Sequence, residues 1–119
     1  MGFTHVPLKV KLAHNHPQFA EVSFLVDSGA VYSIVPQATL QELGIEPHRT
    51  LEFVLADGTK LTRKVGDAFF EYQGSGGAAP VIFEQDGDAA LLGVTALESL
   101  ALVLNPFSRQ LSQMKLLLA

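Results

Sequence analysis

The sequence contains no cysteine, which excludes disulfide bonds, a thiolate nucleophile and any metal site built from cysteine. It also lacks a cluster of basic residues. Eight Lys and Arg stand against twelve Asp and Glu, giving a net charge of −4, and the longest basic run is the pair Arg63-Lys64. Nucleic-acid binding needs lysine and arginine concentrated on one phosphate-tracking surface, so we do not expect nucleic acid as a partner.

Long hydrophobic runs are missing as well. No stretch reaches the length of a membrane span, and residues 1–17 alternate apolar residues with lysine instead of forming the apolar core of a signal peptide. We therefore expect no membrane partner and a cytoplasmic location. Of the 119 residues, 48% are hydrophobic, which is enough for the core of one domain over 1–119. This content also leaves apolar surface that favours self-association.

Alternating side chains predict a first hairpin. Residues 6–12 and 19–26 both place apolar residues at every second position, the pattern of half-buried strands, and HNHP at 14–17 is a turn between them. The second strand ends at Val26, immediately before Asp27. A carboxylate is thus delivered by an apolar strand into a tight Ser-Gly turn, where low-dielectric surroundings would raise the free energy of its ionised form.

The middle of the chain predicts a second hairpin, because two β-rich arms in residues 50–72 flank the pair Asp57-Gly58, which tolerates the positive φ angles of tight turns. Pro36 suits the first turn of a short helix that stops at Gly44. The glycine-rich residues 74–80 are predicted to be a flexible loop.

The last third predicts one more helix and three short strands. Thr95 and Glu98 match a capping box, which would open a helix that runs to about Ala101. The apolar segments 81–83, 102–105 and 115–118 are predicted as strands. Together these elements give a mainly β protein with one or two short helices.

Three motifs, in this order, resemble the retropepsin-like aspartic proteases, most closely the small bacterial or retroelement-type members. FLVDSGA, residues 24–30, is similar to the catalytic Asp-Thr/Ser-Gly-Ala motif, with Ser28 where many members have threonine. ALLGVTALESL, residues 90–100, is similar to the later motif of two apolar residues and a glycine followed by a helix, and LADGTKL, 55–61, lies where the family has its flap. The resemblance extends over roughly residues 6–117 and implies a closed-barrel fold that acts as a homodimer, with the active site on the two-fold axis.

The resemblance also implies a set of site residues. Asp27 would be the catalytic acid, Gly29 would allow the tight turn and the close approach of substrate, and Ser28 would hydrogen-bond across the two-fold axis. The peptide would lie extended between this floor and the flap. The expected substrate-binding residues are Ala30, Val31 and Ile34 beside the turn, and Ala56, Asp57, Gly58 and Thr59 in the flap.

The chemistry needs a second carboxylate, because amide hydrolysis without a metal or a covalent nucleophile requires both a base and an acid within reach of one water. The other aspartates suit this role poorly: Asp57 is in a turn, Asp67 follows a glycine near a strand end, and Asp86 and Asp88 lie in a polar loop. We therefore expect Asp27 of a second, identical chain to be the partner, and a bell-shaped pH dependence that favours acid.

No cofactor or metal is expected. The two histidines of HNH at 14–16 lie in a predicted turn without a third ligand, and DGD at 86–88 is not followed by the oxygen ligands of a calcium loop. The sequence thus predicts an aspartic endopeptidase that acts on an extended polypeptide. The alternative is a dimerisation or peptide-binding module with the same fold and no catalysis, because a fold does not guarantee an activity.

Overall fold

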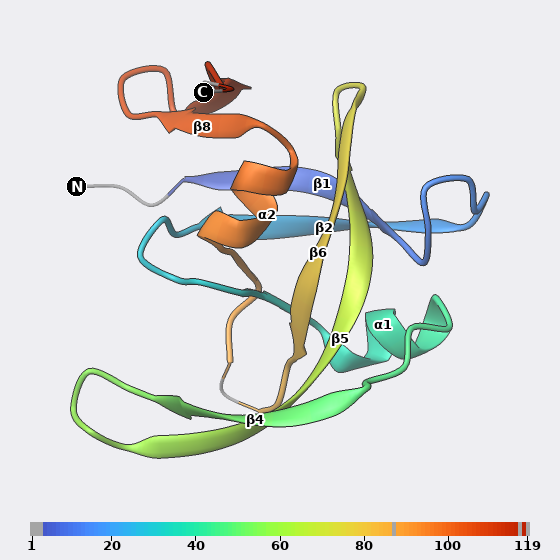
Figure 1. Ribbon diagram of the computed structural model, residues 1–119, viewed down its shortest axis with the longest axis vertical. Helices are drawn as coiled ribbons and strands as arrows, with labels where there is room; N and C mark the ends of the chain where they lie inside the picture. Colours follow the sequence, from blue (N-terminus) through green and yellow to red (C-terminus); the bar gives the residue numbers. More distant parts are fainter. Residues whose placement is uncertain (1–3, 87, 117, 119) are drawn as a thin grey trace.

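The computed structural model describes residues 4–86, 88–116 and 118, and within them the chain is mainly β, as the sequence predicts (Figure 1). These residues form the strands β1 (His5–Lys11), β2 (Phe19–Val26), β3 (Ser33–Val35), β4 (Arg49–Val54), β5 (Lys60–Tyr72), β6 (Ser75–Phe83), β7 (Leu91–Leu92), β8 (Leu102–Asn105) and β9 (Gln110–Gln113), and the helices α1 (Gln37–Glu42) and α2 (Val94–Ser99).

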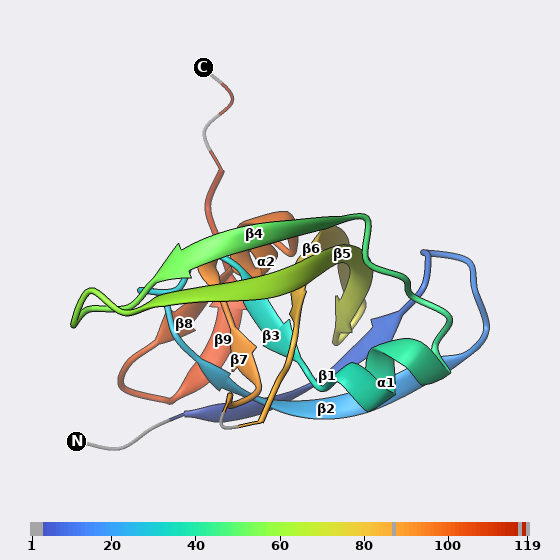
Figure 2. The ribbon, with the colours of Figure 1, turned by 90° about the horizontal axis from the view of Figure 1, so that it is seen from below.

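Most of the strands of this described part form one sheet, in the order β1-β2-β7-β3-β6-β5-β4, and β1 makes an additional antiparallel pairing with β5. β8 and β9 form a separate hairpin. Figure 2 shows β4 and the adjoining half of β5 along one side of the molecule, β1 and β2 along the other, and β3, β6 and β7 between them. The parallel pairing of β2 with β7 places the end of β2 beside a segment that is distant in the sequence.

The predicted first hairpin is confirmed, since β1 and β2 pair antiparallel over their full length. Its apolar face supplies much of the core: Val6, Leu8 and Val10 of β1 are buried, as are Val22, Phe24 and Val26 of β2. The Phe24 ring packs against the ring of Phe70 on β5. Because the strand alternates, burying Phe24 and Val26 fixes which way the chain leaves the sheet at Asp27.

The predicted loop at 74–80 is wrong, because Ser75–Phe83 forms strand β6, paired with the second half of β5. The glycines serve close packing here. A Cβ at Gly77 would lie 2.4 Å from the carbonyl oxygen of Ser99 at the end of α2, and a Cβ at Gly76 would lie 2.7 Å from the Phe69 ring. Glycine thus lets α2 approach the backbone of β6. The glycine content, from which a flexible loop was predicted, instead serves this close packing.

Both helices lie where the sequence predicts them, but their first residues and caps differ from the prediction. Helix α1 follows Pro36, which is its N-cap residue, and ends before Gly44, whose φ of +78° continues the chain in the left-handed region. Helix α2 begins at Val94 with Gly93 as its N-cap and without a side-chain cap hydrogen bond, so the predicted capping box of Thr95 and Glu98 is wrong.

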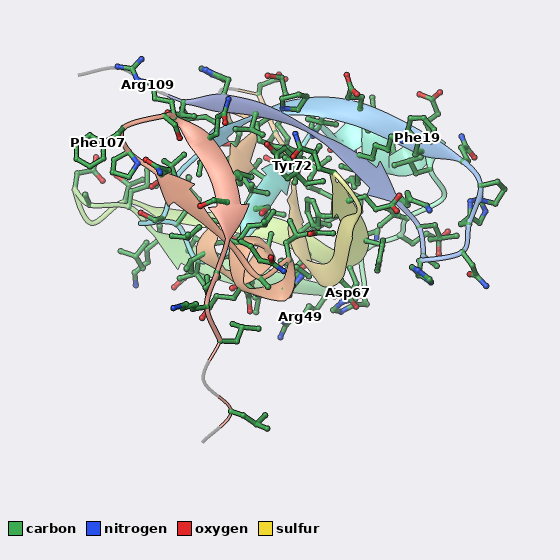
Figure 3. The ribbon with its side chains drawn as sticks, turned by 90° about the horizontal axis from the view of Figure 1, so that it is seen from above. Phe19, Arg49, Asp67, Tyr72, Phe107 and Arg109 are labelled. Atoms are coloured by element: carbon green, nitrogen blue, oxygen red, sulfur yellow. The ribbon has the colours of Figure 1, made fainter. Side chains whose placement is uncertain are left out.

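At the C-terminal end the predicted strand 102–105 is confirmed as β8. The predicted strand 115–118 is wrong for the residues that can be described there, 115, 116 and 118, while Leu117 lies outside the described residues. The partner of β8 is instead Gln110–Gln113, with Leu111 buried. The loop between β8 and β9 carries Phe107, which is 96% exposed and lies at the edge of the molecule in Figure 3.

Candidate active site

The turn after β2 holds Asp27 by backbone hydrogen bonds. The Asp27 N–H donates to the Leu92 carbonyl of β7 over 3.0 Å, and the Ala30 N–H donates back to the Asp27 carbonyl over 3.1 Å. The side chain is oriented as well, because the Gly29 N–H donates to its Oδ1 over 2.9 Å. Backbone geometry therefore sets the position of this carboxylate, and the hydrogen bond from Gly29 sets its orientation.

The start of α2 holds the same turn through backbone hydrogen bonds. Its first two N–H groups donate to the carbonyls of Ala30, over 2.8 Å, and Val31, over 3.1 Å, which replaces a side-chain cap. A Cβ at Gly93 would lie 2.7 Å from the backbone carbonyl of Tyr32, and the Gly93 N–H donates to the buried hydroxyl of Ser33 over 2.9 Å. Only glycine allows this approach, which explains physically why the LLG motif lies beside the DSGA turn.

Within the single chain, Asp27, Ser28 and Gly29 are exposed. The low-dielectric surroundings expected from the sequence are therefore not supplied by this chain, since the apolar strand ends before the carboxylate. The hydroxyl of Ser28 makes no hydrogen bond within the described residues, which leaves it free to donate or accept outside the chain. Within the described residues, nothing covers these three residues.

A cavity of about 580 Å³ opens beside Asp27, under the β4–β5 hairpin. The expected site residues Asp27, Gly29, Ala30, Val31, Ile34 and Ala56 line it, whereas Ser28, Asp57, Gly58 and Thr59 do not. Most of the remaining wall is apolar and comes from strands distant in the sequence. These further lining residues are Tyr32, Phe53, Val54, Leu55, Leu61, Arg63, Ile82 and Asp88.

The turn of the β4–β5 hairpin differs in detail from the expected two-residue turn. The Leu55 N–H donates to the Thr59 carbonyl and the Gly58 N–H to the Leu55 carbonyl, and only Gly58 has a positive φ, of +88°. Asp57 accepts a hydrogen bond from the Thr59 N–H over 2.9 Å. Hydrogen bonding from the Thr59 side chain, and then from this N–H, lowers the pKa of the Asp57 carboxyl group. The turn is exposed throughout, so local hydrogen bonds alone define its shape.

The other aspartates fit a catalytic pair with Asp27 poorly. Of the acids in the described ranges, only Asp88 shares the cavity, and its carboxylate is bound by Arg63. The hydrogen bond from Arg63 is the main reason why the pKa of Asp88 lies below its usual value, so Asp88 resists taking up a proton. Asp57 is in the exposed turn. Asp67, which is labelled in Figure 3, lies 3.1 Å from His48 and does not line the cavity.

The Arg63–Asp88 pair was missed by sequence reasoning, which placed Asp88 in a solvated loop. Nothing local in the sequence signals it, because the partners lie on different elements and meet only through the fold. Tyr32 was also missed. Its ring lies edge-on to that of Phe53 at a centroid distance of 6.3 Å, and Arg49 donates to its hydroxyl over 3.4 Å.

Two other kinds of feature are absent from residues 4–86, 88–116 and 118. No group of three or more His, Cys, Asp or Glu side chains is placed to hold a metal ion there. In the same part of the chain, no helix has both the length and the apolar character needed to cross a membrane.

Comparison with solved structures identifies the fold. The chain is similar to the "Solution structure of Simian Foamy Virus (mac) protease", with a TM-score of 0.51 and 24% sequence identity over 78% of this chain and 92% of that chain. No protein-family model and no curated protein matches the sequence. The chain has a retropepsin-like fold. At this identity the likeness establishes the architecture, and the chemistry has to be argued from the site.

Proposed function

We propose that this protein is an aspartic endopeptidase in which two identical chains each contribute Asp27 to one active site. The observation that carries the proposal is the placement of Asp27. Backbone hydrogen bonds hold its carboxylate at the end of β2, where the residue is exposed and accessible to a second chain. It lies beside a mostly apolar cavity that the β4–β5 hairpin also lines. The likeness to a viral protease, and the additional β1–β5 pairing expected of a closed barrel, support the same conclusion.

The two carboxylates would share one proton, because like charges brought together disfavour double ionisation. The ionised carboxylate removes a proton from a bound water as the water oxygen attacks the carbonyl carbon of the peptide bond. The protonated carboxyl group gives its proton to the carbonyl oxygen, which forms a tetrahedral diol. As the diol collapses and the C–N bond breaks, the carboxyl group that took the proton from water gives it to the amide nitrogen, and the other carboxylate takes a proton from a diol hydroxyl. The pair then again carries one proton.

The geometry fits an extended peptide as substrate. The cavity is bounded by the Asp27 turn on one side and by Phe53, Val54 and Leu55 of the hairpin on another. A strand-like peptide would gain main-chain hydrogen bonds there and place alternate side chains against the walls. Because the walls are mostly apolar, we expect an apolar side chain next to the cleaved bond.

The test is cleavage of a peptide library by purified protein, with Asp27→Asn as the matched variant. We expect cleavage by the wild type and loss of at least about a thousandfold in kcat/KM in the variant, because the amide cannot act as a base. An unchanged circular dichroism spectrum would show that the fold is retained. A folded wild-type dimer that cleaves nothing over a wide pH range would contradict the proposal and favour a binding or dimerisation module instead.

A further inference from the structure

One charged pair in the cavity wall has no part in the chemistry described so far. Arg63 on β5 binds Asp88, in the segment between β6 and β7, through two hydrogen bonds: Nε to Oδ2 over 2.9 Å and Nη2 to Oδ1 over 3.0 Å. The two side chains are only 13% and 14% exposed. A two-point contact with this little exposure is geometrically specific, unlike an ordinary surface ion pair.

Each nitrogen of the Arg63 guanidinium group and each carboxylate oxygen of Asp88 takes part in at least one hydrogen bond within the chain. The Gln85 N–H also donates to Asp88 Oδ2 over 2.9 Å, and the third nitrogen of the guanidinium group, Nη1 of Arg63, donates to the Thr62 carbonyl over 3.0 Å. Both oxygens of Asp88 therefore already accept hydrogen bonds from the chain. These bonds fix the pair between β5 and the segment that precedes β7.

The pair connects the hairpin to the strand that carries the catalytic acid. Two residues after Asp88, the Ala90 carbonyl accepts from the Leu25 N–H over 3.0 Å, and the Leu92 carbonyl accepts from the Asp27 N–H over 3.0 Å. On the other side, Arg63 pairs across the hairpin with Leu51, near the base of the arm that leads to the turn. A short covalent path thus runs from the Arg63 contact to the backbone partner of Asp27.

The other arm of the hairpin has a weaker attachment. Tyr32 contacts β4 through the edge of the Phe53 ring and a single hydrogen bond of 3.4 Å from Arg49, which is near the upper limit for such a bond. The Arg63–Asp88 pair is the stronger of these two side-chain links between the hairpin and the Asp27 side of the cavity.

We propose that Arg63 and Asp88 are positioning residues that fasten the base of the β4–β5 hairpin, so that its turn is held over Asp27. This inference rests on the proposed function for its kinetic consequence. The hairpin contacts the peptide before and during the reaction, so loss of the link should weaken ground-state and transition-state binding alike and raise KM more than it lowers kcat.

The kinetic test uses Arg63→Gln, Asp88→Asn and the double variant. Matched controls are Lys64→Gln, an exposed neighbour on β5, and Asp86→Asn, in the same loop as Asp88 but outside the cavity lining. We expect KM to rise about tenfold in each single variant with kcat within about twofold, no further rise in the double variant, and no change in the controls. Arg63→Lys, which keeps the charge and loses the two-point contact, should fall in between.

A second measurement does not depend on activity. Hydrogen–deuterium exchange of the amides in residues 50–65 should become about tenfold faster in Arg63→Gln and Asp88→Asn and remain unchanged in the controls. If the amides exchange as slowly as in the wild type, or if KM is unchanged in an active enzyme, the positioning role is wrong. If the wild type cleaves no peptide, the proposed function fails, and the exchange rates still decide on the link. Should one variant fail to fold, Arg63→Lys provides the same readout with the charge retained.

Discussion

The turn that carries Asp27 and the hairpin that lines the same cavity are held in place by different means. Asp27 and Ala30 bond to β7 and α2 through their backbones, and Gly93 packs directly against the Tyr32 carbonyl. The turn of the β4–β5 hairpin is exposed and bonds only within itself, and the hairpin is attached to the Asp27 side at its base through Arg63 and Tyr32. The Asp27 turn is thus held by the backbones of its neighbours, while the hairpin turn makes hydrogen bonds only within itself. We therefore expect the hairpin turn to be the more mobile of the two.

Adding a side chain at Gly93 should disturb the Asp27 turn and have the largest effect on stability. In Gly93→Ala the new Cβ would meet the backbone carbonyl of Tyr32 at 2.7 Å, and that backbone cannot move without disturbing the Asp27 turn. We expect the free energy of unfolding to fall by about 3 kcal/mol, as measured by urea denaturation.

The matched control is Gly76→Ala, whose Cβ would come equally close, 2.7 Å, to the ring of the half-buried Phe69. A side chain can rotate away, so this change should cost less than about 1 kcal/mol. Equal costs for the two variants would mean that contact with the backbone at Gly93 is not what makes the turn rigid.

Changing Gly58 tests the mobile side, with a large effect on turnover and a small one on stability. Gly58 has a φ of +88° and nothing lies within 4 Å of its missing Cβ, so a substitution there strains only the backbone. Gly58→Val should lower kcat/KM about a hundredfold, equivalent to about 2.7 kcal/mol, and stability by only about 1 kcal/mol. Gly58→Asn, which tolerates positive φ, should stay near the wild type in both; equal losses in the two variants would contradict this role of the turn.

The smallest expected effect is on the pH dependence of stability, which should differ between Asp88 at the base of the hairpin and Asp57 in its turn. Both Asp88 and Asp57 have a pKa lowered by hydrogen bonds, so each stabilises the fold above its unfolded pKa, and that contribution is lost as pH falls through the folded value, below about 4. Asp88 is mostly buried and Asp57 is exposed. In urea denaturation at pH 5 and pH 3, Asp88→Asn should therefore reduce the acid sensitivity more than Asp57→Asn, and the reverse order would be inconsistent with a buried link.

Local patterns predicted the elements that are stabilised by their own side chains. Alternation along β1 and β2 gave their bounds to within about two residues and placed Asp27 at the end of a strand, and the Asp57-Gly58 turn gave the second hairpin. These predictions succeeded because a half-buried strand carries its burial pattern in its own residues.

Features that depend on distant partners were not predictable in this way. The glycines of β6 are strand residues only because α2 packs on them, and α2 needs no side-chain cap because the carbonyls of Ala30 and Val31 accept its first N–H groups. Arg63 and Asp88 meet only when β5 lies beside the segment between β6 and β7. The composition of residues 84–88 predicted a polar loop, and one of its acids is instead partly buried in an ion pair.

The proposed pairing of two chains is tested most directly by mixing wild-type protein with Asp27→Asn chains. When subunits exchange freely and pair without preference, a tenfold excess of the variant leaves about one wild-type chain in eleven paired with another wild-type chain. With subunit exchange verified by native mass spectrometry, we expect the rate per wild-type chain to fall to about a tenth. A rate that stays proportional to the amount of wild-type chain would show that each chain carries a complete site, and would contradict the shared pair of Asp27 carboxylates.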